Sequence, residues 1–221
     1  QMIHFATTCI DNFFKYPNAI RDYANSLEFD SVQKNYPGRR TKELSSVNPT
    51  LAQYINTKYL VNHYPMGAPI QCKTEMHFQK ISGEFDKGWI HGDDRIVHTT
   101  IVYLTPNASL DSGTSLWIPK EGRHPLIPGQ DIISIKHKAY TNKINSEEAE
   151  SHRLKWNGNF DEVTRFSNVY NRCIGFDGSQ WHSANNFAQN EKEEERLTLI
   201  TFWVDIVGSQ TGLQRTQMEI I

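Results

Sequence analysis

The sequence has few cysteines and no long hydrophobic segment, and each absence excludes a class of protein. Only Cys9, Cys72 and Cys173 occur in 221 residues, and no two of them are spaced as C-x-x-C. An odd number of distant cysteines suits neither a disulfide framework nor a thiolate zinc site, so a reducing, cytoplasmic location is expected. No apolar run approaches the ~20 residues of a membrane span, and residues 1–10 lack the hydrophobic region of a signal peptide.

An excess of charge of one sign is also lacking. The chain has 23 Lys and Arg against 25 Asp and Glu, which gives a formal net charge of −2. Such a balance provides no broad electrostatic attraction to nucleic acid or to an anionic membrane, so neither is expected as a partner. The expected partner is a small-molecule or peptidyl substrate, and the pattern indicates no particular oligomeric state.

What the chain does contain is enough apolar material for a folded core. Hydrophobic residues make up 38% of the sequence and aromatic residues 11%, a composition that argues against a disordered chain. No internal repeat, low-complexity tract or Gly/Ser linker marks a boundary. A single domain over residues 1–221 is therefore predicted, because all-β domains of about this length are common.

Two amphipathic helices are predicted within a helical N-terminal flank, residues 1–60. Residues 17–29 begin with a proline suited to the first turn of a helix, and their apolar positions recur with a helical period: Ile20, Tyr23, Ala24 and Leu27. Residues 48–60 begin with Asn48 and Pro49, a capping residue followed by a first-turn proline. Both helices precede the residues that carry chemistry.

Beyond about residue 60 the pattern changes to short strands rich in β-branched and aromatic residues. These strands are predicted at residues 73–81, 88–93, 96–104, 114–118, 131–136, 169–176 and 196–206. Helices followed by strands predict a mainly β fold with flanking helices, whose core spans about residues 60–206. Residues 138–168 interrupt the strands, and Ser146 to Lys155 read as a polar helix. An insertion of this length predicts a less ordered lid or flank over the opening.

The sequence Trp89-Ile90-His91-Gly92-Asp93 is the first candidate for a metal site. His91 and Asp93 are two residues apart, so on a strand both side chains face the same side and can reach one ion. His182, in Gln180-Trp181-His182-Ser183, supplies a third ligand from the start of a later strand. Two histidines and one carboxylate form the facial triad of non-haem iron oxygenases, which leaves coordination positions open for substrates.

Arg196 and Thr198 open the last strong strand and share one of its faces. A guanidinium binds a carboxylate through two hydrogen bonds, and a hydroxyl two residues away can share that carboxylate. The pair is therefore predicted to be a carboxylate receptor. The alternative is that Arg196 is solvated or paired with the acidic residues 193–195.

These segments together resemble the 2-oxoglutarate and iron(II)-dependent oxygenase superfamily, especially its prolyl-4-hydroxylase-like branch. The resemblance covers about residues 60–206 and rests on motifs in the same order: His91-Gly92-Asp93, the strand from His98 to Leu104, the segment from Asp111 to Trp117, Gly175-Phe176-Asp177, Trp181-His182 and Arg196-x-Thr198. It implies a double-stranded β-helix, which is a jelly roll of the cupin-like kind. It also implies a dioxygenase that consumes 2-oxoglutarate and molecular oxygen, releases succinate and CO2, and hydroxylates an amino acid, a peptidyl residue or another small metabolite.

The resemblance also assigns roles to residues. It implies that His91, Asp93 and His182 bind iron(II), while Arg196 with Thr198 holds the distal carboxylate of 2-oxoglutarate. Halogenating members of the superfamily replace the carboxylate ligand by a small residue, so the presence of Asp93 favours hydroxylation. One departure is the interval of 14 residues from His182 to Arg196, which is longer than usual and predicts an extended loop.

Several lesser candidates are expected on the same face or near its mouth: Thr100, Gln79, His77, the competing ligand His98, Asn171 and Arg172, the loop Tyr36-Pro37-Gly38-Arg39-Arg40, Trp89 and Trp117. Thr100 is the first of these for binding 2-oxoglutarate. The aromatic and basic loop suits an anionic or planar substrate. Two other classes of function stay open: a cupin-like metalloprotein that uses zinc or manganese, and a non-enzymatic jelly roll that binds a ligand or partner.

Overall fold

The computed structural model describes residues 7–30, 36–64, 69–82, 87–93, 95–121, 132–187 and 195–208. Its elements, in chain order, are β1 (Thr8–Ile10), α1 (Pro17–Ser26), β2 (Arg39–Arg40), α2 (Leu44–Val47), α3 (Pro49–Leu60), β3 (Gln71–Ile81), β4 (His98–Tyr103), the 3-10 turn η1 (Leu110–Ser112), β5 (Thr114–Pro119), α4 (Ile132–Tyr140), α5 (Ser146–Asn157), β6 (Phe160–Phe166), β7 (Cys173–Asp177), β8 (Trp181–Ala184) and β9 (Arg196–Val207).

The strands form two antiparallel sheets. The larger sheet has six strands in the order β1-β7-β4-β9-β3-β2, and the smaller has three in the order β6-β5-β8. Every strand pair is antiparallel. Strand β4 lies between β7 and β9, which both come much later in the sequence. The prediction of a mainly β fold with flanking helices is confirmed.

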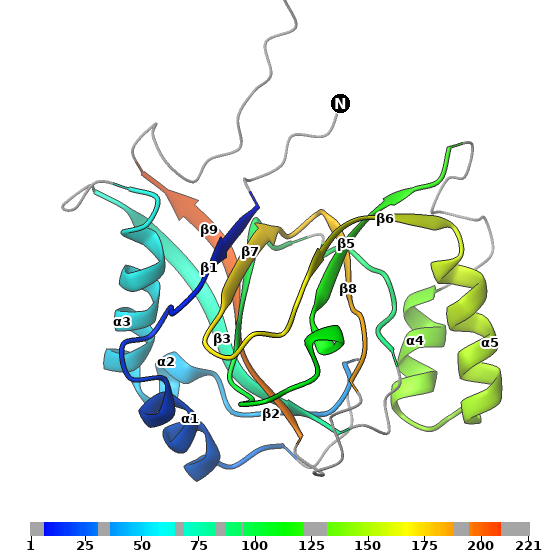
Figure 1. The fold of residues 1–221 in the computed structure, drawn as a ribbon, viewed down its shortest axis with the longest axis horizontal. Coiled ribbons are helices and arrows are strands. Elements are labelled where there is room, and N and C mark those ends of the chain that lie inside the picture. The colour runs from blue at the N-terminus through cyan, green and yellow to red at the C-terminus, as the bar shows by residue number, and fades with distance from the viewer. Residues whose placement is uncertain are drawn as a thin grey trace, which may run out of the picture.

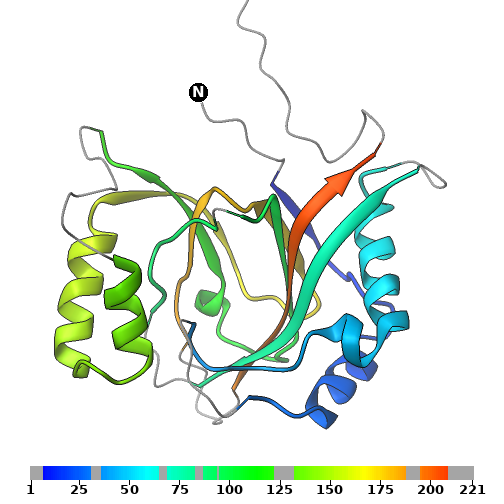
Figure 2. The ribbon, with the colours of Figure 1, turned by 180° about the vertical axis from the view of Figure 1, so that it is seen from behind.

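Helices cover both sides of this β structure. Figure 1 shows α1, α2 and α3 on one side and α4 and α5 on the other, with the strands between them, and Figure 2 shows the same arrangement from behind. Two helices begin at an asparagine cap: Asn48 accepts a hydrogen bond from the backbone N–H of Leu51, and Asn145 from that of Glu148. Such caps satisfy donors that the first turn leaves free.

Three apolar clusters hold the layers together. The largest packs α1 and α3 against the six-stranded sheet and includes Ala24, Tyr59 and Trp203. The second, with Leu116 and Phe176, joins strands of the two sheets. The third lies between the smaller sheet and α4 and α5: Trp89, Ile90, Tyr140, Trp156 and Phe160. Helices therefore pack against each sheet, while the second cluster joins the two sheets to each other.

Most predicted elements are found close to their predicted bounds. The predicted helices 17–29 and 48–60 correspond to α1 and α3. The predicted strands 73–81, 96–104, 114–118 and 196–206 correspond to β3, β4, β5 and β9, and 169–176 overlaps β7. The predicted ranges do not include β1, β2, β6 and β8. A strand was nevertheless expected to begin at His182, and β8 contains this residue.

Two predicted strands are wrong. Residues 132–136 begin helix α4, and residue 131 lies outside the described residues. The run Ile-Ile-Ser-Ile reads as a strand, but Ile135 and Ala139, four residues apart, both pack against the third cluster, and this spacing requires a helix. Residues 88–93 form only an isolated bridge at His91.

The insertion 138–168 consists of regular elements rather than one long loop. It contains the end of α4, all of α5 and β6, and the predicted polar helix from Ser146 to Lys155 is confirmed as α5. Tyr140, at its start, lines the cavity described below, so the insertion flanks the opening. None of the described helices is long and apolar enough to cross a membrane. The prediction of a single domain stays a prediction.

Candidate metal centre and its cavity

His91 and His182 face each other across two hydrogen-bonded backbone segments. The His91 N–H donates to the His182 carbonyl at 3.0 Å, and the His182 N–H donates to the His91 carbonyl at 2.8 Å. Gly88 allows this approach, because a Cβ at that position would lie 2.8 Å from the Ala184 carbonyl oxygen. Both histidines are therefore fixed by main-chain bonds that do not use their imidazoles.

Asp93 joins the two histidines to form a cluster of three possible ligands. One ligand atom from each of His91, Asp93 and His182 lies within 4.8 Å of the others. The His182 Nε2 is 3.6 Å from one Asp93 carboxylate oxygen, and the His91 Nε2 is 4.0 Å from the other. The Asp93 N–H donates to the Gly178 carbonyl at 2.7 Å, which ties the carboxylate to the turn before β8.

The hydrogen bonds of the two imidazoles leave one nitrogen of each for the cluster. The His91 Nδ1 bonds the Trp89 carbonyl at 2.8 Å, and the His182 Nδ1 bonds the Gln180 carbonyl at 2.8 Å. A carbonyl only accepts, so each Nδ1 carries the proton and each Nε2 keeps its lone pair. Burial lowers the pKa of both imidazoles, with the cation of Lys136 acting in the same direction. Both rings are thereby kept neutral, which metal binding requires.

The donor set fits a divalent transition metal. Two neutral imidazoles and one carboxylate favour iron(II), and backbone acceptors behind the imidazoles are the usual outer partners of metal-binding histidines. The Asp93 Oδ2 is buried and accepts no hydrogen bond from any residue that the structure describes. A buried carboxylate oxygen without a donor costs free energy, and a metal ion would compensate this cost.

The cluster opens into a cavity of about 250 Å³ between the two sheets. Its lining includes the three clustered residues, aromatic and aliphatic side chains, and three cations: Arg40, Lys136 and Arg196. A concave, partly apolar site with a few convergent polar groups is the usual form of a small-molecule site.

Arg196 is buried in this cavity without a carboxylate partner. Arg196 is only 3% exposed to solvent, and its guanidinium forms no ion pair within the described ranges. The Nε donates to the Ser112 carbonyl at 2.8 Å, while the rings of Tyr103 and Phe187 lie 5.4 and 5.8 Å from the guanidinium carbon. Burial lowers the pKa of Arg196. The solvated alternative is thus wrong, and Glu195 instead pairs with Arg39.

Thr198 lies beside Arg196 but Thr100 does not. On β9, Arg196, Ile200 and Phe202 line the cavity, so Thr198 faces the same side by strand alternation. The Thr198 Oγ1 is buried and has no hydrogen-bond partner among the described residues. Thr100 accepts a hydrogen bond from the Trp203 indole at 3.2 Å, on the face of β4 opposite Thr99, which lines the cavity.

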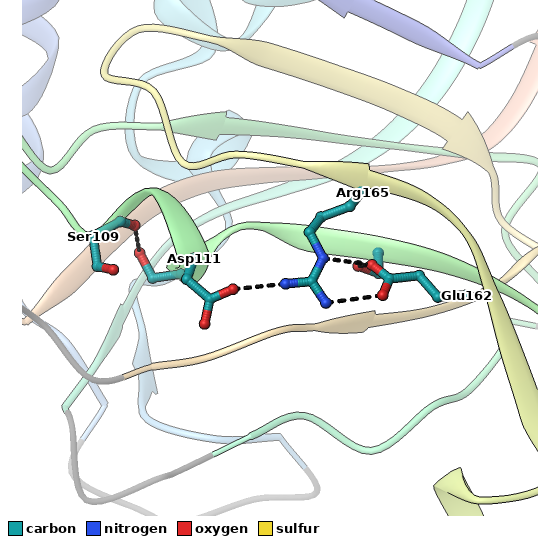
Figure 3. A network of polar contacts seen from close by, with 6 residues as sticks. Ser109, Asp111, Glu162 and Arg165 are labelled. Carbon is teal, nitrogen blue, oxygen red and sulfur yellow. Dashed lines mark hydrogen bonds and ion pairs between the residues drawn. The ribbon is translucent and has the colours of Figure 1, made fainter.

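A surface network holds the turn that positions Arg196. Figure 3 shows the Arg165 guanidinium between the carboxylates of Glu162 on β6 and Asp111 on η1. Its bonds join η1 to the smaller sheet, and Ser112, the last residue of η1, presents its carbonyl to Arg196. Because all three charged groups are exposed or partly exposed, the network contributes little to stability but fixes the direction of this turn.

Arg40 and Lys136 form a second pair of cations in the cavity. The Arg40 guanidinium lies 3.9 Å from the centre of the Tyr36 ring and 5.2 Å from that of Phe202. Burial lowers the pKa of Arg40 to about 10 and that of Lys136 to about 8, while the charge of Asp93 opposes both shifts. Both cations therefore lie close enough to Asp93 to interact with it.

The remaining predicted candidates divide between cavity and scaffold. The cavity receives Gln79 and Trp89 together with Tyr36 and Pro37 of the basic loop, whereas Arg39 is exposed. The others make contacts typical of the scaffold: His98 bonds the Tyr59 hydroxyl at 2.6 Å, His77 the Thr41 carbonyl, Asn171 the backbone of Phe14, Arg172 the carboxylate of Asp11, and Trp117 the hydroxyl of Ser183. Part of the predicted extended loop, residues 188–194, lies outside the described residues.

The model of a family of unknown function, DUF6445, matches residues 4–203. The chain belongs to DUF6445. No curated protein matches it.

Solved structures similar to this DUF6445 chain include several metal- and 2-oxoglutarate-binding proteins. HygX from Streptomyces hygroscopicus, crystallised with nickel, 2-oxoglutarate and hygromycin B, is 16% identical with a TM-score of 0.55, covering 90% of this chain and 82% of HygX. The epimerase SnoN in complex with Fe3+, alpha ketoglutarate and nogalamycin RO is 13% identical with a TM-score of 0.54, covering 91% and 79%. A prolyl hydroxylase from Trichoplax adhaerens, in complex with a hypoxia inducible factor peptide, is 11% identical with a TM-score of 0.50, covering 89% and 82%. At these identities the likeness establishes a shared fold.

Among the cavity residues of the DUF6445 chain that sequence reasoning missed are Lys136 and Tyr140, which both lie on α4. The error followed from reading residues 131–136 as a strand. The signal that could have found them is the apolar spacing after Ile135. Ala139 follows four residues later, which is the period of a helix and not of a strand.

Proposed function

We propose that this chain is an iron(II)- and 2-oxoglutarate-dependent dioxygenase. Iron would be held by His91, Asp93 and His182, and the distal carboxylate of 2-oxoglutarate by Arg196 with Thr198. The observation that carries the proposal is one cavity that contains both a two-histidine, one-carboxylate cluster and a buried arginine without a counter-ion among the described residues. The two features are the two halves of a site for a chelating, doubly anionic co-substrate.

Each residue of the site has a defined role in this proposal. The Trp89 and Gln180 carbonyls hold both imidazoles with Nε2 toward the metal. Arg196, oriented by Ser112, would hold the far end of 2-oxoglutarate and leave its keto acid end free to chelate the metal. When bound, iron(II) activates molecular oxygen at the expense of 2-oxoglutarate, which leaves as succinate and CO2. The aromatic lining excludes water from that reaction.

Support for the finer fold and family assignment comes from topology and motif order. Strands β4, β7, β8 and β9 bring residues separated by about half the chain into two facing sheets, as a double-stranded β-helix requires. HygX, SnoN and the prolyl hydroxylase adopt the shared fold while binding metal or 2-oxoglutarate, or acting on a peptide. Within that superfamily we place the chain in the prolyl-4-hydroxylase-like branch, on the order of its motifs.

Hydroxylation is the proposed reaction, because Asp93 occupies the position that halogenating members leave to a halide. The similar structures include both a hydroxylase and an epimerase, so their likeness alone does not choose the reaction. A small metabolite, an amino acid or a single peptidyl side chain suits a cavity of about 250 Å³.

The deciding experiment is the anaerobic addition of iron(II) and then 2-oxoglutarate to the purified protein. Chelation of the metal by the keto acid is expected to give a weak visible charge-transfer band with a stoichiometry of one. His91→Ala and His182→Ala are expected to abolish the band and to leave the protein folded, because their backbone bonds remain.

A matched control is His152→Ala, a histidine on α5 outside the cluster, for which no change in the band is expected. A cupin-like zinc or manganese protein would bind metal without developing the band. A non-enzymatic binding protein would bind no stoichiometric metal. Retention of full iron binding in the double variant His91→Ala, His182→Ala would show that the ligands are misassigned.

A further inference from the structure

Among the residues that the structure describes, three cations and one carboxylate line the cavity, and this imbalance points beyond the co-substrate. Arg40, Lys136 and Arg196 are the cations, and Asp93 is the carboxylate. If the proposed function holds, the two positive charges of iron(II) are balanced by the two negative charges of 2-oxoglutarate. The cavity then keeps an excess of two positive charges. Buried charges without counter-ions are costly, so a further anion is expected to bind there.

The contacts of Arg40 direct its guanidinium away from the start of β9, where Arg196 lies. A row of paired residues crosses the larger sheet from Arg40 on β2 through Gln79 on β3 to Thr198 on β9. From there the Arg40 side chain extends to Phe202, at 5.2 Å from its ring centre. Phe202 is six residues beyond Arg196 on the same strand, which corresponds to roughly 20 Å of strand. The Arg40 guanidinium therefore packs against a part of β9 that lies away from the Arg196 backbone.

Ring contacts orient the Arg40 guanidinium, and no hydrogen bond from its Nε is found within the described residues. Its guanidinium lies over the Tyr36 ring and beside Phe202, and its Nε is buried with no hydrogen-bond partner among the described residues. Arg39, the adjacent residue, pairs with Glu195 at 2.8 Å instead. A planar guanidinium packed between rings keeps its fork for a ligand and loses little side-chain entropy on binding.

Lys136 approaches the same region from α4, on the opposite flank of the cavity. In the parts of the chain that the structure describes, its ammonium forms no ion pair. It lines the same cavity as His91, Asp93 and His182, and its charge helps to lower the pKa of both imidazoles. Arg40 and Lys136 thus place two cations from separate elements beside the position where a substrate would react.

We infer that Arg40 and Lys136 form a second anion-binding site, which holds the carboxylate or phosphate group of an anionic substrate beside the candidate metal. This inference rests on the proposed function and names its substrate class. The aromatic residues Tyr36, Trp89 and Tyr140 line the same cavity and would pack against the apolar part of such a substrate. The substrate is therefore a small molecule or side chain with an anionic group next to an apolar body.

The test uses protein loaded anaerobically with iron(II) and 2-oxoglutarate, so that Arg196 is already occupied. Benzoate and phenyl phosphate are titrated by calorimetry, with benzamide as the neutral analogue of the same shape. At least one anion is expected to bind ten or more times more tightly than benzamide, and the tighter of the two identifies the preferred group. Arg40→Gln and Lys136→Met are each expected to weaken that anion at least tenfold.

Matched controls are available beside each cation. Arg39 on the same strand and Lys138 on the same helix are not among the residues that line the cavity. Arg39→Gln and Lys138→Met are therefore expected to leave anion affinity unchanged. Benzamide binding as tightly as both anions, or full anion affinity in both Arg40→Gln and Lys136→Met, would overturn the inference. Failure of the oxygenase proposal is a separate result, because the charge-transfer band would then be absent from wild-type protein before any probe is added.

Discussion

Replacement of Arg196 by methionine is expected to weaken 2-oxoglutarate binding strongly while it changes the stability of the ligand-free protein little. The side chain is buried, its charge has no carboxylate partner among the described residues, and its Nε donates a hydrogen bond to the Ser112 carbonyl at 2.8 Å. A residue kept for packing would lower stability when it is removed. A residue kept for binding an anion is a cost to the empty protein and a gain only when the ligand is present.

The magnitudes follow from the contacts. A hydrogen bond to a charged group contributes about 1.5–3 kcal/mol, so losing the guanidinium fork is expected to weaken 2-oxoglutarate by roughly one to three orders of magnitude. Replacing a buried charge by an apolar side chain is often neutral or stabilising by about 1–4 kcal/mol, whereas the lost bond from the charged guanidinium to Ser112 costs about 1.5–3 kcal/mol. The two contributions largely offset each other, so the free energy of unfolding of the ligand-free variant should lie within about 3 kcal/mol of wild type.

Two measurements check this prediction. The affinity for 2-oxoglutarate is obtained by titrating the anaerobic iron(II) complex, and the free energy of unfolding by urea denaturation without ligand. Arg196→Lys is expected to lose affinity as well, because an ammonium does not reproduce the fork. The matched control is Arg172→Gln, which breaks an ion pair with Asp11 outside the cavity and should leave 2-oxoglutarate binding intact. A large loss of stability in Arg196→Met with unchanged 2-oxoglutarate affinity would refute the reasoning.

Three further predictions concern the metal, the buried histidine and the surface network. Asp93→Gly is expected to retain weakened iron binding and to lose most turnover, and a variant as active as wild type in an oxygen-consumption assay would contradict its role. Burial lowers the pKa of His98 to about 3, below its unfolded value of ~6.5, so the unfolded chain takes up a proton first as the pH falls. Stability is then lost below about pH 6.5, by up to about 1.4 kcal/mol per pH unit down to pH ~3, and His98→Gln should flatten this slope in urea denaturation at pH 7, 6 and 5. Arg165→Gln should cost no more than about 1 kcal/mol of unfolding free energy and change 2-oxoglutarate affinity less than about threefold by titration; a larger loss would show that the network does more than direct η1.

The candidate ligands could be predicted from the sequence because their chemistry is local. His91 and Asp93 need only a two-residue spacing in an extended segment, and His182 needs only a strand that returns beside them. The isolated bridge between the two histidines shows that even a segment too irregular to count as a strand preserves this arrangement. Residue type and spacing were sufficient here.

Which face of a buried strand meets the cavity could not be predicted. All six residues of β4 are buried, so no alternation of polar and apolar residues marks one side, and Thr99 and Thr100 look alike in the sequence. A shift of one residue exchanges the two faces of a strand. Only the packing of the neighbouring elements, with Trp203 against Thr100 and the open cavity against Thr99, decides between them.

The position of Lys136 escaped prediction for a different reason. A short isoleucine-rich run is compatible with either a strand or a helix, and local propensity does not choose. The choice follows from contacts of Ile135 and Ala139 with the aromatic cluster beside the smaller sheet. These contacts depend on elements distant in the sequence, so tertiary packing overrides the local pattern.

The two reciprocal backbone bonds between His91 and His182 separate the shape of the site from its reactivity. Neither bond uses an imidazole, so both segments keep their places whichever side chains stand there. The main chain therefore sets the places of positions 91, 93 and 182, and the side chains at these positions set which metal ligands are present. Exchange of one of these side chains can produce a new metal preference or a new reaction in a single mutational step, while the protein continues to fold.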